Sequence, residues 1–278
     1  MRLVVDGRGV NAATGAVPVD PDSTDPLVVL LHGAGMDRSV WSQQTRFLAH
    51  HGYRALAVDL PGHGESEGPA LGSIPDLATW VSELAAELGG PLHLVGHSMG
   101  SLVALETAAH QPASVASIVL LGVAATMPVH PDLQAAADAD DVEAARLITS
   151  WAHGSRQHVG ENPTPGLWML GGTQALLERC APGVLGADLS ACSAYGTGVE
   201  AAALVSCPVT LVLGGGDKMT PRQAAEPLVE AFPGGADVVE LPSTGHMMMQ
   251  EEPGAVRQAI IEHLESASRC QEAEPPGG

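Results

Sequence analysis

Short apolar runs alternate with longer amphipathic runs through the first half of this 278-residue chain, and this alternation limits the possible folds more than any other feature. Each apolar run has the length of a buried strand, and each amphipathic run has the length of a helix. Strands joined through helices pair in parallel and are covered on both faces. The expected strands are 27–31, 55–58, 92–95 and 115–121, and the expected helices are 40–50, 75–88 and 99–110.

The alternation stops near Gly122 and resumes at residue 209. From there we expect strands 209–213 and 237–241, and helices 221–231 and 253–266. The segment between carries no strand pattern and has an alanine-rich, helical texture, for example over 132–151 and 173–179. The sequence therefore predicts an α/β core (1–122 and 204–268) interrupted by a helical cap, or lid (123–203). An antiparallel hairpin from the first residues would extend the sheet edge, and 269–278 has the composition of a disordered tail.

The sequence GHSMG, residues 96–100, stands between the expected strand 92–95 and the expected helix 99–110, so Ser98 falls on a sharp turn. Gly96 and Gly100 omit side chains that would collide there. A serine in this position points out above the sheet edge, where its hydroxyl could attack a substrate. Because glycine and serine are also common in ordinary turns, the partners of Ser98 must decide between a nucleophile and a turn residue.

Charge and hydropathy exclude several classes of partner. The chain has 32 acidic and 12 basic side chains, a net charge of −20, which repels nucleic acid and anionic membrane surfaces. The apolar runs are too short to span a bilayer, and the first residues lack the apolar stretch of a secretory signal. We expect a cytoplasmic monomer or homodimer that acts on a small molecule, with no nucleic acid and no membrane among its partners.

The cysteines do not form a metal-binding or disulfide pattern. Cys180, Cys192, Cys207 and Cys270 are scattered, with no CxxC pair and no histidine at zinc-ligand spacing. We therefore expect reduced thiols and no metal ion. The mechanism expected below requires no cofactor.

The loop LHGAGMD follows the first expected parallel strand, at the sheet edge where chemistry collects in folds of this class. Its small residues let backbone N–H groups approach a developing oxyanion. We assign this role to the N–H of Ala34, with the N–H of Met99 at the start of the next helix as the second donor. His32 is expected to be structural.

The loop DLPGHGES, residues 59–66, follows the second parallel strand. Asp59 and His63 could imitate a catalytic acid and base. A tight turn held by the side chains of Asp59 and Ser66 explains the same residues better.

Two further loops supply an acid and a base. Asp217 in LGGGDKMTP lies just past strand 209–213, and His246 in LPSTGHMMMQEEP lies in the loop after the last strand. A carboxylate can accept a hydrogen bond from a histidine ring nitrogen and fix the tautomer of the ring. The chain order Ser98, Asp217, His246 is that of a nucleophile, an acid and a base.

Five motifs, spread over nearly the whole chain, together resemble the α/β-hydrolase superfamily: HGAG (32–35), DLPGHGES (59–66), GHSMG (96–100), GGGDKMTP (214–221) and GHMMMQEEP (245–253). The resemblance implies a mostly parallel, doubly wound sheet of the eight-stranded type, flanked by helices. It also implies that Ser98 is the nucleophile, Asp217 the acid and His246 the base. A serine nucleophile excludes the branch that opens halogenated or epoxide substrates with an aspartate.

This arrangement predicts a serine hydrolase that cleaves a carboxylic ester or lactone through an acyl-enzyme. Its activity should rise from acidic to neutral pH, because His246 must begin neutral. The same motifs also resemble those of carbon–carbon bond hydrolases, of perhydrolases or haloperoxidase-like enzymes, and of aminopeptidases. A non-catalytic ligand-binding protein could also keep the fold, so these alternatives stay open.

Large apolar side chains near these loops are candidates for the substrate pocket: Met36, Met219, Met247, Trp151 and Trp168. Thioethers can line an adaptable apolar pocket, although methionine is equally an ordinary core residue. The cap segment holds few cations and many acids, which disfavours a multiply anionic substrate. We therefore expect a small, largely apolar substrate, and we expect Lys218, the only lysine, to face solvent.

Overall fold

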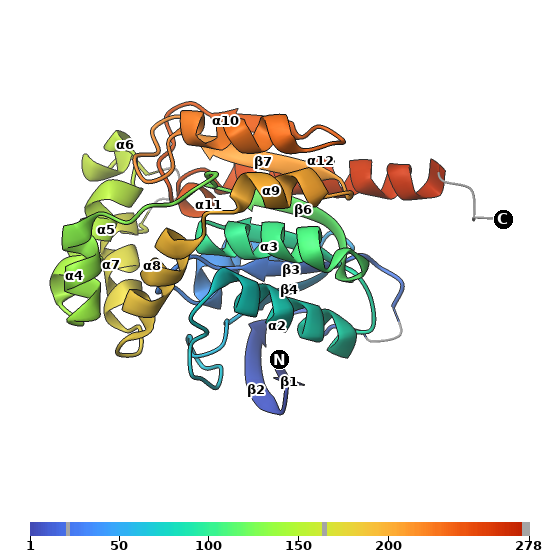
Figure 1. Cartoon of the computed structure of the whole chain (residues 1–278), viewed down its shortest axis with the longest axis horizontal. Helices are drawn as coiled ribbons and strands as arrows, with labels where there is room; N and C mark the ends of the chain where they lie inside the picture. Colours follow the sequence, from blue (N-terminus) through green and yellow to red (C-terminus); the bar gives the residue numbers. More distant parts are fainter. Residues whose placement is uncertain (21–22, 163–165, 274–278) are drawn as a thin grey trace.

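One sheet forms the centre of the molecule, with its strands in the order β1-β2-β4-β3-β5-β6-β7-β8. The structure is a computed structural model that describes residues 1–20, 23–162 and 166–273. β2 pairs antiparallel with both β1 and β4, whereas the other neighbouring strands pair in parallel. Helices cover both faces of this sheet (Figure 1). The predicted doubly wound α/β fold and the hairpin at its edge are confirmed.

The strand bounds agree closely with the apolar runs. β3, β6 and β8 have the predicted bounds, and β4, β5 and β7 are slightly longer than predicted. The strands are β1 (Arg2–Val5), β2 (Arg8–Ala13), β3 (Leu27–Leu31), β4 (Arg54–Val58), β5 (Leu92–His97), β6 (Val115–Leu121), β7 (Val209–Gly214) and β8 (Asp237–Leu241).

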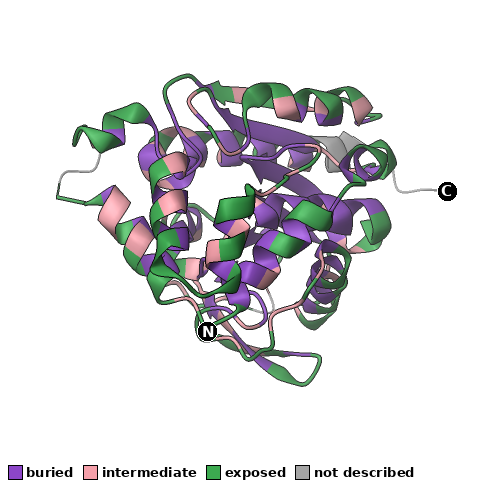
Figure 2. Ribbon diagram, turned by 60° about the vertical axis from the view of Figure 1, so that its left-hand side comes forward, coloured by how far each residue is buried: buried purple, intermediate pink, exposed green. Residues whose placement is uncertain are grey.

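The sheet buries one apolar cluster on each face. Because successive side chains of a strand point to opposite faces, the continuous apolar run of β3 feeds both clusters, Val29 into one and Leu30 into the other. Buried residues follow the strands and the inner sides of the helices (Figure 2). The helices of the first face are α2 (Ile74–Glu87), α3 (Met99–His110), α9 (Gly198–Leu204) and α10 (Arg222–Ala231). Those of the second face are α1 (Ser42–Ala49), α11 (Met248–Glu251) and α12 (Pro253–Ala273). The chain also has two short 3-10 helices among its described residues, η1 (Arg38–Trp41) and η2 (Pro112–Ser114).

Within the described residues, helices also occupy the segment between β6 and β7, where the sequence has no strand pattern. They are α4 (Pro131–Asp138), α5 (Val142–Ala152), α6 (Ser155–His158), α7 (Met169–Glu178), α8 (Val184–Ala194) and α9. α4 to α8 gather at one end of the sheet (Figure 1), whereas α9 packs against α3 and α10. The stretch 132–151 is divided into two helices, because Asp140 adopts a left-handed backbone conformation with φ 50°. The division into a core and a cap at residues 123 and 203 stays a prediction.

The last helix is longer than the sequence pattern indicates. α12 runs to Ala273, so residues 269–273, expected to be disordered, are helical. The residues there are compatible with a helix, and the first proline of the tail comes only at position 275. The rest of the expected tail, residues 274–278, lies outside the described residues.

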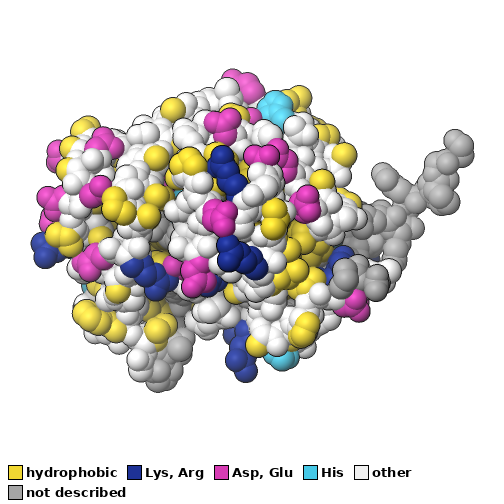
Figure 3. Space-filling model, turned by 90° about the horizontal axis from the view of Figure 1, so that it is seen from below, with side chains coloured by type: hydrophobic (Ala, Val, Ile, Leu, Met, Phe, Trp, Pro, Cys, Tyr) yellow, Lys and Arg dark blue, Asp and Glu magenta, His cyan; other side chains and the backbone are white. Residues whose placement is uncertain are grey.

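The surface shows a mixture of side-chain types. On the face drawn in Figure 3, basic side chains are scattered among acidic and apolar ones. Within the described ranges, no helix combines the length and the apolar character needed to cross a membrane.

The turn from β5 into α3 depends on close backbone contacts at two glycines. A Cβ atom on Gly96 would lie 2.2 Å from the carbonyl oxygen of Gly100, and a Cβ on Gly100 would lie 2.3 Å from that of Leu31 in β3. Both neighbours are backbone atoms, so they cannot move aside as a flexible side chain would. The start of α3 therefore packs directly on the end of β3.

We expect Gly100→Ala to destabilise the protein by about 3 kcal/mol, because the added methyl group overpacks a backbone contact. Gly90→Ala is the matched control: a Cβ added at Gly90 would have no atom within 4 Å, so stability should change by less than about 0.5 kcal/mol. Urea unfolding followed by circular dichroism measures both. Equal stabilities of the two variants would contradict the packing described for this turn.

Candidate active site

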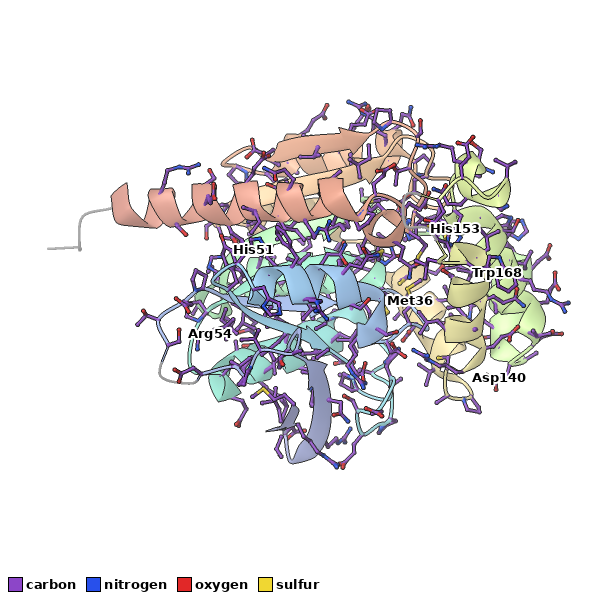
Figure 4. The ribbon with its side chains drawn as sticks, turned by 180° about the vertical axis from the view of Figure 1, so that it is seen from behind. Met36, His51, Arg54, Asp140, His153 and Trp168 are labelled. Atoms are coloured by element: carbon purple, nitrogen blue, oxygen red, sulfur yellow. The ribbon has the colours of Figure 1, made fainter. Side chains whose placement is uncertain are left out.

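Loops from the carboxyl ends of the strands meet helices α4, α5 and α8 around a cavity of about 440 Å³. The sheet-edge loops contribute Ala34, Met36, Ser98, Met127, Pro128, Val129, His130, Lys218, Met219, Thr220 and His246. The helices contribute Leu133, Ile148, Trp151, Leu189 and Cys192. Figure 4 shows Met36 where the sheet body meets these helices.

Ser98 lies at the tip of the β5–α3 turn in a conformation that side chains rarely adopt. Its φ is 54° and its ψ is −116°, which costs about 1–3 kcal/mol for a residue other than glycine. Its own N–H donates to the carbonyl oxygen of Leu121 at 2.9 Å, which holds the turn. Gly33 leaves room for the side chain, since a Cβ there would lie 3.3 Å from the Ser98 Cβ. The turn therefore presents the hydroxyl to the cavity.

Asp217 and His246 form a buried hydrogen-bonded pair across the ends of β7 and β8. The Nδ1 of His246 donates to Oδ2 of Asp217 at 2.8 Å, and the side chains are 2% and 0% exposed. The other oxygen, Oδ1, accepts the N–H groups of Met219 at 2.8 Å and Thr220 at 2.9 Å. These bonds place the carboxylate and fix the histidine proton on Nδ1.

The environment keeps Asp217 ionised. Burial raises the pKa of its carboxyl, but the charge and hydrogen bond of His246, together with the bonds from Thr220, lower it by more, so the pKa lies below its ordinary value. With Nδ1 of His246 committed to Asp217, the free basic atom of the ring is Nε2. This atom is buried and has no hydrogen-bond partner among the described residues. His246 and Ser98 line the same cavity.

Groups from outside the sheet hold the loop that carries His246. The His246 N–H donates to the carbonyl oxygen of Ala152, at the end of α5, at 2.7 Å. The buried carboxylate of Glu251 accepts the N–H groups of Gly154 at 3.0 Å and Gly245 at 3.1 Å through the same oxygen. The position of His246 therefore depends on the segment between β6 and β7.

The two expected oxyanion donors lie beside Ser98. Ala34 follows Gly33, which abuts the Ser98 side chain, and Met99 is the first residue of α3. Within the described residues, neither N–H donates a hydrogen bond to another group of the chain. Both N–H groups are therefore available to an oxyanion, and their role stays a proposal.

The histidine of the HGAG loop has a structural environment. His32 is fully buried; its Nδ1 bonds to the carbonyl oxygen of Gly33 at 2.9 Å, and its Nε2 accepts the N–H of Leu60 at 3.1 Å. Burial, with the neighbouring charge of His63, lowers the pKa of His32 to about 3. Both ring nitrogens are occupied, which agrees with the expected structural role.

The DLPGHGES loop forms the tight turn that the sequence favours. Asp59 accepts the N–H of Arg38 at 2.8 Å and the N–H of Glu65 at 2.9 Å, and it is paired with the guanidinium of Arg38. The Ser66 hydroxyl donates to the Asp59 carbonyl oxygen at 2.8 Å. His63 pairs with a carboxylate from α8 and does not line the cavity.

Two of the five expected pocket residues lie elsewhere. Met36, Met219 and Trp151 line the cavity. Met247 is fully buried in the apolar cluster that includes residues of α12. Trp168, just before α7, is 77% exposed and does not line the cavity. The expectation for Met247 and Trp168 is therefore wrong.

Several lining residues were not expected from the sequence. His130 follows β6, so the rule that locates chemistry at the ends of parallel strands could have found it. Leu189 and Cys192 come from α8, and nothing in the sequence tells which helix faces the cavity. Lys218 is exposed, as expected, but it also lines the cavity.

Comparison with known proteins agrees with this geometry. Residues 28–259 match the family model described as "Alpha/beta hydrolase family". A pimeloyl-[acyl-carrier protein] methyl ester esterase from Aromatoleum aromaticum is 34% identical over 243 residues, which cover 82% of this chain and 94% of the relative. A non-heme chloroperoxidase from Streptomyces lividans is 36% identical over 111 residues, which cover 38% of this chain and 39% of the relative.

The crystal structure of the enol-lactonase from Burkholderia xenovorans has a similar fold, with a TM-score of 0.83 and 21% identity over 95% of this chain and 100% of that chain. The family match extends over most of the chain, from β3 to α12. The chain belongs to the alpha/beta hydrolase family.

We expect Asp217→Asn to slow the labelling of Ser98 by a fluorophosphonate roughly 10⁴-fold, because the amide no longer holds the His246 proton on Nδ1. Asp237→Asn, the same chemical change at the exposed amino end of β8, should label at the rate of the wild type. Mass spectrometry of timed samples gives both rates.

The pH dependence of the free energy of unfolding provides a second test of Asp217→Asn. The lowered pKa of Asp217 stabilises the folded protein above the ordinary carboxyl pKa, and this contribution is lost as pH falls through the lowered value. The stability difference between wild type and Asp217→Asn should therefore be larger at neutral than at acidic pH. Equal labelling rates, or a pH-independent stability difference, would count against the hydrogen-bonded pair of Asp217 and His246.

Proposed function

We propose that this protein is a serine hydrolase that cleaves a carboxylic ester or lactone of a small, largely apolar substrate. The observation that carries the proposal is the buried and unpartnered Nε2 of His246, which shares a cavity with Ser98 while Asp217 holds the other ring nitrogen. A buried nitrogen without a hydrogen-bond partner costs free energy, unless a transferred proton or a substrate supplies the missing interaction. The curated esterase relative and the family match support this class of reaction.

In the reaction, Oγ of Ser98 attacks the substrate carbonyl carbon while Nε2 of His246 takes the hydroxyl proton. Asp217 stabilises the resulting imidazolium through Nδ1. The N–H groups of Ala34 and Met99 stabilise the tetrahedral oxyanion, each contributing about 3 kcal/mol. The carbon–oxygen bond then breaks, and His246 returns the proton to the leaving alcohol. Water attacks the acyl-enzyme by the same route and releases the acid.

The lining of the cavity favours an apolar acyl group. Most of its wall is carbon and sulfur, contributed by residues such as Met36, Ile148 and Leu189. Lys218 and His130 line the cavity and are both exposed, so they lie where it opens to solvent. A small apolar acid fits the interior, and polar groups fit only near the opening.

We also propose that residues 123–203 act as a cap over the site. Leu133, Ile148 and Trp151 from the helices of this segment line the cavity together with the sheet-edge loops. Access to Ser98 therefore depends on how this segment is positioned, although α9, at its end, packs on the core.

We expect the wild type to hydrolyse p-nitrophenyl esters, with kcat/KM rising from acetyl to longer acyl chains by up to about four-fold per buried methylene until the cavity is full. Ser98→Ala should show no hydrolysis above the uncatalysed rate. Ser155→Ala, an exposed serine in α6, is the matched control and should retain full activity.

Labelling with a fluorophosphonate distinguishes ester hydrolysis from other reactions of the triad and from ligand binding without catalysis. A wild type that is labelled on Ser98 but turns over no ester would contradict ester hydrolysis and favour carbon–carbon cleavage or another reaction of the triad. A wild type that is neither labelled nor active, and so behaves like Ser98→Ala, would contradict any catalytic role and favour ligand binding.

The two tryptophans of the segment 123–203 provide a matched pair for the pocket. Trp151→Ala should raise KM for the longest accepted ester about ten-fold with little change in kcat, because it removes apolar wall from the cavity. Trp168→Ala, at a 77% exposed position, should leave both constants unchanged. Steady-state kinetics measures both constants. The same KM for the two variants would contradict the assignment of Trp151 to the wall of the cavity.

A further inference from the structure

A second buried histidine–carboxylate pair lies beside the candidate active site. Nε2 of His63 lies 2.7 Å from Oδ2 of Asp188, and each side chain is only 1% exposed. His63 belongs to the turn after β4, and Asp188 belongs to α8. The pair therefore joins the sheet edge to the segment between β6 and β7, and the proposed reaction does not use either group.

The hydrogen bonds of His63 show where its protons lie. Nδ1 lies 3.0 Å from the carbonyl oxygen of Pro61, which can only accept, so Nδ1 carries a proton. Nε2 faces the carboxylate of Asp188, so a second proton lies between the ring and that oxygen. Burial lowers the pKa of His63, but Asp188, the Pro61 carbonyl and the charge of Asp59 raise it by more. The pair is thus a neutral unit with one shared proton.

The same oxygen of Asp188 also holds the oxyanion loop. Oδ2 accepts the N–H of Gly35 at 2.8 Å, and Gly35 directly follows Ala34. Gly35 has φ +66°, and a Cβ there would lie 2.7 Å from Cδ1 of Leu185, so the loop runs directly against α8. The other oxygen, Oδ1, is buried and has no partner among the described residues. The carboxylate is therefore held by the proton shared with His63 and by the Gly35 N–H.

One face of α8 contacts both the loop and the cavity. Leu185, Asp188, Leu189 and Cys192 follow the spacing of residues on one side of a helix. Leu185 and Asp188 contact Gly35, whereas Leu189 and Cys192 line the cavity one turn further along. A rigid helix therefore connects the wall that would contact an acyl group with the loop that would bind the oxyanion.

We propose that Asp188 is a positioning residue for the oxyanion hole: by accepting the Gly35 N–H while it is paired with His63, it holds the Ala34 N–H at the place where the oxyanion forms. This inference rests on the proposed function. The Ala34 N–H lies one peptide unit from the bonded N–H, so a shift of the loop moves the donor with it.

Loss of this anchor should act on the transition state more than on substrate binding. A donor displaced by about 1 Å can cost about 100-fold in rate, whereas the apolar wall that binds the acyl group is still present. Asp188→Ala should therefore lower kcat about 10- to 100-fold and change KM by less than about three-fold.

The experiment compares Asp188→Ala, Asp188→Glu and Tyr195→Phe in the full chain. Tyr195→Phe is the matched control, because its hydroxyl donates a buried 2.7 Å hydrogen bond from the end of α8 to Glu106 in α3, away from the oxyanion loop. Each variant is assayed for kcat and KM with p-nitrophenyl butyrate per labelled site, for the affinity of a trifluoromethyl ketone that forms a tetrahedral adduct, and for the rate of labelling by a fluorophosphonate.

For Asp188→Ala we expect a loss of affinity for the ketone that parallels the loss of kcat/KM, whereas Tyr195→Phe should keep a kcat within about two-fold of the wild type. If Asp188→Ala does not fold, Asp188→Glu decides: it keeps the charge but moves the carboxylate by one methylene, so kcat should fall about ten-fold. The proposal would be overturned if the Asp188 variants had the same kcat and the same affinity for the ketone as Tyr195→Phe. A wild type that is labelled but cleaves no ester contradicts the proposed function alone, and the labelling rates then decide the role of Asp188.

Discussion

The direct packing of the first turn of α3 on the carboxyl end of β3 is the constraint on which the rest of the site depends. It is possible only because Gly96 and Gly100 have no side chains, since a Cβ on either would lie within 2.3 Å of a backbone oxygen. This close contact compensates for the strained backbone of Ser98 and directs its hydroxyl into the cavity. Without it, Ser98 would not share a cavity with His246.

The segment between β6 and β7 supports the chemistry as well as forming part of the cavity. The carbonyl oxygen of Ala152 holds the loop of His246, and Glu251 joins that loop to the same segment through Gly154. On the other side, Asp188 holds Gly35 in the loop of the expected oxyanion donor. Backbone N–H groups in the loops of the candidate site are thus bonded to buried acceptors, which restricts the motion of these loops more firmly than apolar contact alone.

The sequence predicts the sheet and the polar centre of the site better than the walls of the pocket. Apolar runs locate the strands because a parallel sheet must bury both faces, and parallel strands bring Ser98, Asp217 and His246 to one edge whatever the details of the helices. The direction of an individual side chain depends on loop conformation, which separates cavity-lining Met219 from core residue Met247. The role of Asp188 depends on long-range packing of α8, and no local pattern reports it.

Ser98 is proposed to carry the acyl group during turnover. Peptide mass spectrometry of wild-type protein that is mixed with p-nitrophenyl butyrate and quenched in acid within milliseconds tests it most directly. We expect a butyryl group on the peptide that contains Ser98, formed during the first turnover and absent from Ser98→Ala. Ester turnover with the acyl group on another residue, or with no acylated peptide under conditions where deacylation is slower than acylation, would contradict it.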